Sequence, residues 1–257
     1  MSKLIMLVIV NSYVTLSWAS NELRELEYAE AIESSFSIGA IVWLQTDTGK
    51  FLTLYTETEQ TDNLGTAIIL HPMDGHPDQK KLINPLRTYL PQHNWATLSL
   101  QMPVLGIKAK EQEYYPLFGQ AKERIQAGID YLVSAGVKNI VLIGYGLGSM
   151  MAIHYLKETV NSSDVKAVVA ISLSVPKSEH RNVQIIDFIS EIQQPILDIY
   201  AEYDLPEVTD SARKRRIAGK TSAAYRQFHL EGEGHTFQHD EGLVVKRAYS
   251  WINRTFK

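Results

Sequence analysis

The feature that most constrains the fold is a glycine-rich turn between an apolar run and a helical pattern, in residues 139–155 (NIVLIGYGLGSMMAIHY). Ile140–Ile143 is short and rich in β-branched residues, which is typical of a buried strand. Glycines then occupy every second position, at Gly144, Gly146 and Gly148, and apolar side chains recur at helical spacing after them. The order strand, tight turn, helix indicates an α/β fold.

A turn of this kind presents a catalytic nucleophile when its pattern is G-x-S-x-G, because the sharp bend exposes the central side chain. Here the outer glycines are in place and the central residue is Gly146. Glycine has no side chain to attack a carbonyl, so the ordinary covalent mechanism is not expected. It does tolerate the positive φ of such a turn, which is a conformational explanation for its presence. Ser149 is the nearest hydroxyl, and its position predicts a helix-start residue rather than a relocated nucleophile.

Length and composition fit one large α/β domain. The 257 residues, 45% of them hydrophobic, are enough for a continuous core. A formal net charge of -4 gives no electrostatic reason to expect nucleic acid as a partner. There is no cysteine, which excludes disulfides, a thiolate nucleophile and a cysteine-ligated metal site.

The remaining polar clusters predict no cofactor and no metal. The sets His71, Asp74, His76 and His235, His239, Asp240 show no recognised ligand spacing, so their histidines are expected to be solvated loop residues. The three glycines resemble a dinucleotide-binding turn only loosely, without the required spacing or a following acidic residue. The basic run Arg213, Lys214, Arg215, Arg216 is expected to be a solvated helix face, with contact to an anionic surface as the alternative.

Residues 1–19 indicate export. Lys3 gives a positive start, residues 4–16 are mostly apolar, and SWA at 17–19 places small residues where signal peptidase reads them. A membrane anchor is the alternative, but the apolar run is short and interrupted by polar residues. We therefore expect a cleaved signal peptide and a mature domain of residues 20–257, periplasmic or secreted, with no transmembrane segment.

Strand and helix patterns alternate along the rest of the chain. Strands are expected at Ile38–Gln45 and Phe51–Thr56 (a hairpin), Thr66–Leu70, Trp95–Leu100, Ile140–Ile143, Val165–Ser172, Pro195–Tyr200 and Ala224–His229. Helices are expected at an exposed lead-in (Asn21–Glu33), from Gln79 to Leu90, from Ala121 (with Ile125, Ile129, Leu132 and Val133 on one face), after the glycine turn, and around Val244–Ile252. This alternation predicts a mostly parallel sheet covered on both faces.

An acid and a histidine follow the last two strands. Asp204 lies after the seventh strand and His235, in Gly232–His235, after the eighth, so the chain order is turn, acid, histidine. An acid fixes the imidazole tautomer, and the imidazole then removes a proton. The backbone N–H groups of Met73 and Leu147 are expected to be oxyanion donors.

These parts, in this order, resemble the α/β-hydrolase superfamily over essentially the whole mature chain. The runs Leu70–Asp78, Trp95–Pro103 and Ile143–Gly146 further resemble an uncharacterised bacterial family of exported α/β-hydrolase-like proteins. The resemblance implies an eight-stranded, mostly parallel sheet with helices on both faces, after an N-terminal antiparallel hairpin. Because residues 173–194 form a short link, no large lid is expected. The resemblance implies no substrate.

Two functional hypotheses remain. In the first, the protein has lost covalent catalysis and binds a small molecule or an envelope protein in the former active-site cleft. In the second, it hydrolyses ester-like substrates, either through water activated by His235 and Asp204 or through Ser149 as a substitute nucleophile. A purely structural hydrogen bond explains the Asp204–His235 pair equally well.

Overall fold

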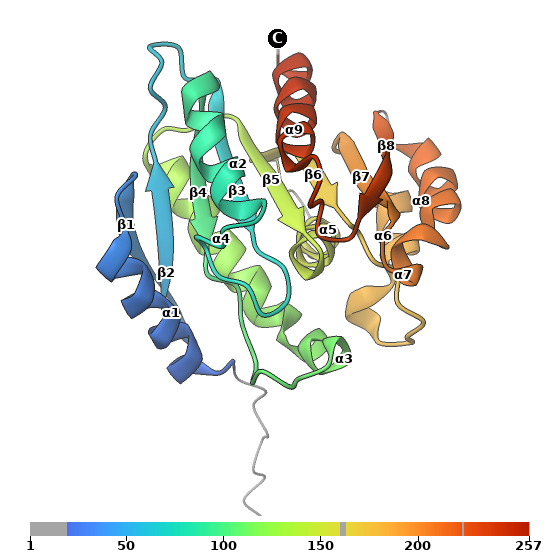
Figure 1. Ribbon diagram of the computed structural model, residues 1–257, viewed down its shortest axis with the longest axis horizontal. Coiled ribbons are helices and arrows are strands. Elements are labelled where there is room, and N and C mark those ends of the chain that lie inside the picture. The colour runs from blue at the N-terminus through green and yellow to red at the C-terminus, as the bar shows by residue number, and fades with distance from the viewer. Residues whose placement is uncertain (1–19, 160–162, 223, 257) are drawn as a thin grey trace, which may run out of the picture.

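The computed structural model describes residues 20–159, 163–222 and 224–256 (Figure 1). The predicted signal peptide, residues 1–19, lies outside the described residues, and its cleavage stays a prediction. Within the described part of the chain, no helix has the length and apolar character needed to cross a membrane.

One sheet of eight strands runs through the molecule, in the order β1-β2-β4-β3-β5-β6-β7-β8. The strands are β1 (Ala40–Thr46), β2 (Gly49–Thr56), β3 (Gly65–Leu70), β4 (Trp95–Leu100), β5 (Ile140–Tyr145), β6 (Val165–Ile171), β7 (Ile196–Tyr203) and β8 (Tyr225–Gly234). The first two form an antiparallel hairpin, and β2 also pairs antiparallel with β4. Every other pairing is parallel, so the expected fold class is confirmed.

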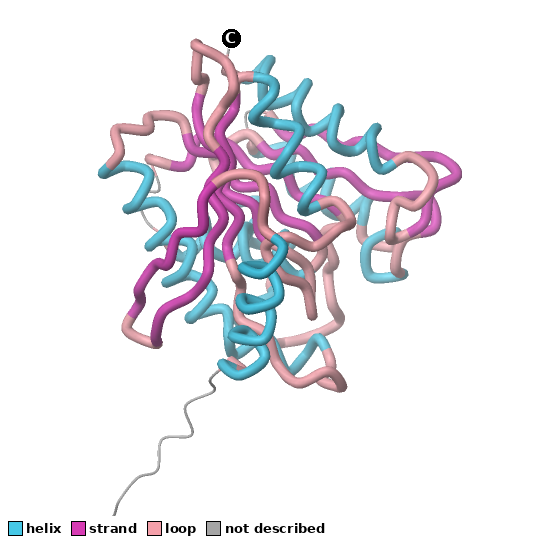
Figure 2. Tube along the Cα trace, turned by 60° about the vertical axis from the view of Figure 1, so that its left-hand side comes forward, coloured by secondary structure: helices cyan, strands magenta, loops and turns pink. Residues whose placement is uncertain are grey.

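Helices cover both faces of this sheet (Figure 2). They are α1 (Glu22–Ser35), α2 (Ile83–Tyr89), α3 (Glu111–Tyr114), α4 (Phe118–Ser134), α5 (Leu147–Glu158), α6 (Ile185–Glu191), α7 (Pro206–Thr209), α8 (Ala212–Ala218) and α9 (Glu241–Thr255), with short 3-10 turns η1 (Leu90–His93), η2 (Tyr115–Leu117), η3 (Arg181–Val183) and η4 (Gly219–Thr221). Buried side chains of α4, α5 and α6 pack on one face, and those of α2 and α9 pack on the other.

The central strands are apolar throughout because both of their faces are buried. In β3, Ile68 and Leu70 pack towards α4 and α5, whereas Ala67 and Ile69 pack towards α2 and α9. Parallel strands end at the same edge of a sheet, so the loops after β3, β5, β6, β7 and β8 meet there. This edge is where the candidate site lies.

Several helix expectations needed correction. Helix α1 is not simply an exposed lead-in, because Ala29 and Ile32 pack against Leu52 and Leu54 of β2. Helix α2 starts at Ile83 and not at Gln79, because the preceding Leu82 has a φ of 60° that ends helical geometry. Val133 was expected on the buried face of α4, and it is 44% exposed.

Strand β8 is longer than expected, whereas β4 and the link before β7 agree with the sequence analysis. Strand β8 continues through Gly234, five residues beyond the expected end at His229, so the Gly232–His235 motif starts within the strand. Strand β4 has the expected bounds, Trp95–Leu100. The link between β6 and β7 contains η3 and α6, and these described residues include no inserted lid domain.

The basic run in α8 is not a uniformly solvated face. Arg215 is fully buried, and its guanidinium binds both carboxylate oxygens of Asp198 in β7, at 2.8 Å (Nε–Oδ2) and 3.2 Å (Nη2–Oδ1). Tyr225 and Gln227 of β8 donate further hydrogen bonds to Asp198 Oδ2. A buried charge needs such a partner, and a run of four basic letters gives no sign of which one turns inward.

Replacing Asp198 with asparagine should lower the free energy of unfolding strongly. Asp198→Asn keeps the side-chain size but leaves the buried Arg215 charge uncompensated, which costs about 3–5 kcal/mol. Urea denaturation measures the change. The exposed Arg213→Gln should stay within about 0.5 kcal/mol of wild type. Equal, small effects of the two variants would contradict a buried ion pair.

Candidate active site

The glycine turn forms the expected strand-to-helix elbow between β5 and α5. Gly146 has φ 55° and ψ -119°, and its N–H donates to the Ile171 carbonyl at 2.9 Å. The outer glycines are needed for close packing: a Cβ on Gly144 would lie 2.5 Å from the Gly148 oxygen, and one on Gly148 would lie 2.4 Å from the Leu70 oxygen. The elbow is therefore geometrically intact although its central residue has no side chain.

Pro72 lies over the elbow. A Cβ built on Gly146 would be 3.3 Å from Pro72 Cβ, a contact tighter than ordinary van der Waals distance. Pro72 belongs to the loop that follows β3. This loop therefore narrows the space in which a nucleophile's side chain would stand.

Ser149 is not placed to replace a nucleophile. Its side chain is fully buried, and its hydroxyl proton faces the carbonyls of Gly144 (2.7 Å) and Ile171 (2.8 Å). The same oxygen accepts a hydrogen bond from the Ile171 N–H at 3.0 Å. These bonds tie α5 to β5 and β6, which agrees with the expected structural role of Ser149 and does not favour it as a substitute nucleophile.

Asp204 and His235 come together because β7 and β8 are parallel neighbours that end side by side. His235 Nδ1 donates to Asp204 Oδ1 at 2.7 Å. The Asp204 side chain is fully buried, whereas 31% of the His235 side chain is exposed. The imidazole is thus held by a buried acid and remains open to solvent, as catalysis by a histidine requires.

Four hydrogen bonds keep Asp204 ionised. Burial is the largest influence on its carboxyl and by itself raises the pKa. Hydrogen bonds from His235, from Ser172 and from the N–H groups of Leu205 and Ala201 together outweigh burial and lower the pKa below its ordinary value. An ionised Asp204 holds the proton of His235 on Nδ1.

Ser172 joins this pair and was not foreseen from the sequence. It follows β6, has a φ of 53°, and donates from its hydroxyl to Asp204 Oδ1 at 2.7 Å. Its oxygen also lies 2.9 Å from His235 Nδ1. A non-glycine residue in this region of φ is strained, and such strain is found at functional sites. The sequence feature that could have indicated it is its position directly after β6, the strand between β5, which leads into the elbow, and β7, which precedes Asp204.

His71 anchors the loop after β3 from inside. It was expected to be a solvated loop histidine, but it is buried, and burial lowers its pKa to about 3. Its Nδ1 donates to the Pro72 carbonyl at 2.8 Å, and its Nε2 accepts from the Met102 N–H at 2.9 Å. A neutral imidazole with these two bonds fixes the position of Pro72 and the residue after it.

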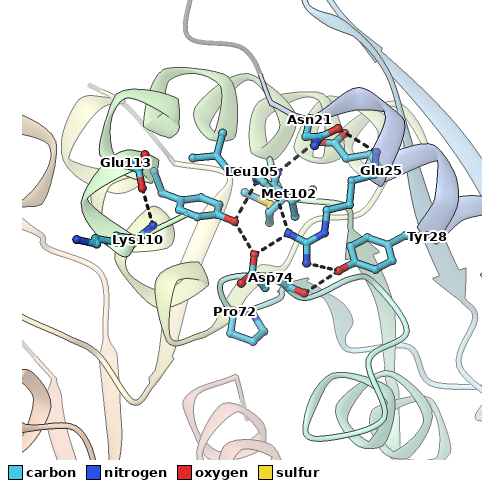
Figure 3. Close-up of polar contacts among 12 residues, drawn as sticks. Asn21, Glu25, Tyr28, Pro72, Asp74, Met102, Leu105, Lys110 and Glu113 are labelled. Carbon is cyan, nitrogen blue, oxygen red and sulfur yellow. Dashed lines mark hydrogen bonds and ion pairs between the residues drawn. The ribbon is translucent and has the colours of Figure 1, made fainter. Parts of the chain in front are cut away.

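Helix α1 and α3 hold the same loop from outside (Figure 3). Asp74 has a φ of 59°, and its Oδ1 accepts from Arg24 Nη1 at 2.7 Å and from the Tyr114 hydroxyl at 2.8 Å. The Tyr28 hydroxyl donates to the Asp74 carbonyl at 3.0 Å. Met73 is therefore fixed on both sides, by His71–Pro72 before it and by Asp74 after it.

The two expected oxyanion donors are positioned by these elements. Met73 lies in the held loop and is 38% exposed, and Leu147 is the first residue of α5. Within the described part of the chain, neither backbone N–H donates a hydrogen bond to another backbone or side-chain group. An N–H without an internal acceptor is available to a ligand oxygen.

Glu111 is a second residue that the sequence did not single out. It is the first residue of α3, and its carboxylate accepts from the Tyr115 hydroxyl at 2.9 Å. Burial raises its pKa above the ordinary value, with an opposing electrostatic influence from His235. A carboxyl group with a raised pKa near the histidine is a candidate proton donor or ligand contact.

None of the described residues forms a cluster of three or more His, Asp or Glu side chains that could hold a metal ion. In the first of the two sets considered in the sequence analysis, Asp74 is bound to Arg24 and Tyr114, and His71 is bound to backbone groups. The histidines of the second set also have different partners. His235 is hydrogen-bonded to Asp204, whereas His239 Nδ1 lies 3.5 Å from Glu233 Oε2.

Acid should destabilise the protein in part through His71. Between the ordinary histidine pKa of about 6.5 and the folded value of about 3, the unfolded chain binds one proton more than the folded chain. The contribution is present above pH of about 6.5 and is lost as the pH falls, by up to about 1.4 kcal/mol per pH unit. Urea unfolding of wild type and His71→Gln across this range measures it. In His71→Gln, the slope of the free energy of unfolding against pH should be smaller than in wild type by close to one proton. A slope equal to that of wild type would contradict the assignment of His71 as a buried neutral imidazole.

Comparison with solved structures shows the fold. Est1E from Butyrivibrio proteoclasticus superposes with a TM-score of 0.66 at 14% identity, over 84% of this chain and 99% of that one. A lid-less α/β serine hydrolase from Xanthomonas campestris gives 0.64 at 13% identity, over 85% and 95%. An α/β serine hydrolase homologue from Coxiella burnetii gives 0.63 at 13%, over 87% and 100%. These likenesses establish the α/β-hydrolase fold.

Sequence comparison identifies the family. No curated protein matches the chain. A family profile does match it, in two overlapping segments, residues 19–114 and 107–254, that together cover nearly the whole chain. The chain therefore belongs to the family described as "Protein of unknown function (DUF3530)", whose member here has an α/β-hydrolase fold.

Proposed function

We propose that this protein binds a ligand at the elbow around Gly146 and forms no covalent intermediate with it. The observation on which the proposal rests is the elbow itself: Gly146 has no side chain, and Pro72 Cβ lies only 3.3 Å from where a Cβ of residue 146 would be. Covalent catalysis needs a nucleophile at the elbow. Ser149, the nearest serine in the chain, is buried, and its hydroxyl is hydrogen-bonded to backbone carbonyls.

The polar groups around the elbow indicate what kind of ligand fits. The Met73 and Leu147 N–H groups are donors without internal acceptors, and His235 is a partly exposed imidazole next to an ionised acid. Such groups favour a carbonyl or carboxylate oxygen in the ligand. A small molecule with an ester, amide or carboxylate group is therefore the class of ligand proposed, and a chain terminus or side chain of an envelope protein could present the same oxygen.

Export is part of the proposal. It rests on Lys3, on the apolar residues 4–16 and on the SWA sequence at 17–19. Helix α1 begins at Glu22, three residues after the predicted cleavage position. The site of action proposed is the periplasm or the medium.

A Gly146→Ser variant tests how much of the catalytic machinery is still formed. Wild type should not be labelled by a fluorophosphonate probe, because the elbow has no oxygen to phosphonylate. Gly146→Ser should be labelled slowly, since the new Cβ meets Pro72, and Gly146→Ser with Pro72→Gly should be labelled faster. His235→Gln added to the double variant should remove labelling, because no base then activates the serine.

Two controls accompany the labelling, which is read by intact-protein mass spectrometry. Gly146→Ala adds the Cβ without the hydroxyl, so its thermal midpoint reports the combined cost of the Pro72 contact and of a side chain at positive φ. Labelling of wild type at the rate of the double variant would overturn the proposal, because a nucleophile other than residue 146 would then exist near the elbow.

Hydrolysis by activated water is a second candidate function. The 2.7 Å Asp204–His235 hydrogen bond favours it, because an oriented imidazole next to an ionised acid is a general base. In this mechanism His235 takes a proton from water as the water oxygen attacks an ester carbonyl, whose oxygen is held by the Met73 and Leu147 N–H groups. The tetrahedral intermediate then collapses, the ester C–O bond breaks, and protonated His235 returns its proton to the leaving alkoxide, which departs as an alcohol.

Steady-state hydrolysis of p-nitrophenyl butyrate distinguishes this candidate from binding alone. Catalysis by His235 predicts turnover without a burst, lost by about 10²-fold or more in His235→Gln. Ser149→Ala is the matched control, and it should keep the rate per folded molecule. A wild-type rate equal to that of His235→Gln would exclude the water mechanism and leave the binding proposal in place.

A further inference from the structure

Residues 211–230 concentrate positive charge in an acidic protein. They contain six of the chain's 25 lysines and arginines and none of its 29 aspartates and glutamates, although the whole chain has a net charge of -4. The segment forms α8, η4 and most of β8, which lie together at one end of the sheet (Figure 1). A cluster of one sign in a protein of the opposite sign calls for a physical explanation.

One of these six charges is neutralised from inside the protein. Arg215 forms the fully buried ion pair with Asp198 described above. The others are exposed, and Arg216, Lys220 and Arg226 form no ion pair with any residue in the described part of the chain. Three uncompensated cations close together repel one another, so the folded protein would be stabilised by an anion among them.

These three cations converge on a surface pocket of about 410 Å³. Its walls also include His229 and the rings of Tyr200 and Tyr225, and no aspartate or glutamate lines it. The Tyr200 and His229 rings lie 5.0 Å apart between centroids, tilted by 34°. The pocket therefore combines cationic groups with an aromatic wall.

The base of the pocket is held by the buried charge network. Tyr225 donates its hydroxyl to Asp198, and the Arg215 guanidinium lies 5.6 Å from the centre of the Tyr200 ring. Both tyrosines are thus tied to the Arg215–Asp198 pair. A pocket with a fixed base loses less entropy when a ligand binds than a set of freely moving surface side chains does.

We propose that this pocket binds the phosphate group of an organic phosphate. Three cations match a multiply charged anion better than a single carboxylate, and a phosphate monoester has a charge of about -1.5 to -2 at pH 7. Two of the three are arginines, whose planar guanidinium pairs with two phosphate oxygens at once. The Tyr200–His229 wall provides a surface for the organic part of the ligand.

The pocket is separate from the candidate active site. Its β8 residues lie in the first half of the strand, whereas His235 follows the end of the same strand; they are Tyr225, Arg226, Gln227 and His229. Binding there does not require the function proposed for the Gly146 elbow. The same phosphate chemistry is available in a soluble phosphate ester and in a phospholipid headgroup, so the experiment includes both sources.

The test compares two double variants that remove the same charge from the same part of the chain. Arg216→Gln/Lys220→Gln removes two cations that line the pocket. Arg213→Gln/Lys214→Gln removes two exposed cations of α8 that do not line it. Binding of pyrophosphate is measured by calorimetry at about 0.15 M salt. Binding to vesicles of phosphatidylglycerol in phosphatidylcholine, against phosphatidylcholine alone, is measured by co-sedimentation. Equal thermal midpoints of the variants verify folding.

The pocket variant should weaken binding of at least one probe by about tenfold or more, and the control variant by less than about twofold. Loss with pyrophosphate identifies a soluble ligand, and loss with vesicles alone identifies a headgroup. Equal losses in the two variants would overturn the proposal, because the attraction would then come from net charge. Failure of wild type to bind either probe with a Kd below about 1 mM would overturn it as well.

Discussion

The close approach of α5 to the sheet is the contact on which the candidate site depends. Gly144 and Gly148 allow it, since a Cβ on either would lie within 2.5 Å of a backbone atom. Ser149 secures it from inside with hydrogen bonds to β5 and β6. These residues preserve the elbow whether or not a nucleophile is present, because they are required for packing. Packing alone therefore explains why the elbow keeps its geometry although Gly146, at its centre, carries no side chain.

Two acidic residues of the β7 segment are partnered in different ways. Asp198, the third residue of the strand, is enclosed with Arg215 and serves packing. Asp204, just after the strand, is equally buried, but its partner His235 is partly exposed. The difference follows from position, because a strand's carboxyl end opens onto the loops whereas its middle is covered by helices. Only the second pair can transmit a charge or a proton to a ligand.

Much of the fold could be predicted from local pattern. Apolar runs such as Thr66–Leu70 and Trp95–Leu100 are strands because both of their faces are buried, and that requirement is visible in composition alone. The pairing of Asp204 with His235 could be anticipated from chain order, because parallel neighbours bring their following loops together. Helix starts were predicted less accurately. Helix α2 begins only at Ile83, because Leu82 before it has a φ of 60°, and a single positive φ does not change the hydrophobic periodicity of the sequence.

The sequence by itself determined that the elbow has no nucleophile, because the identity of Gly146 needs no coordinates. Only the tertiary structure decided what surrounds it: Pro72 over the elbow, Ser172 on the acid, and Asp74 bound by Arg24 from a helix fifty residues earlier. It likewise decided that Arg215 turns inward while Arg216 lines a pocket. The physical reason is the same in each case. These contacts join residues distant in the chain, and which side chain meets which depends on packing that no local pattern records.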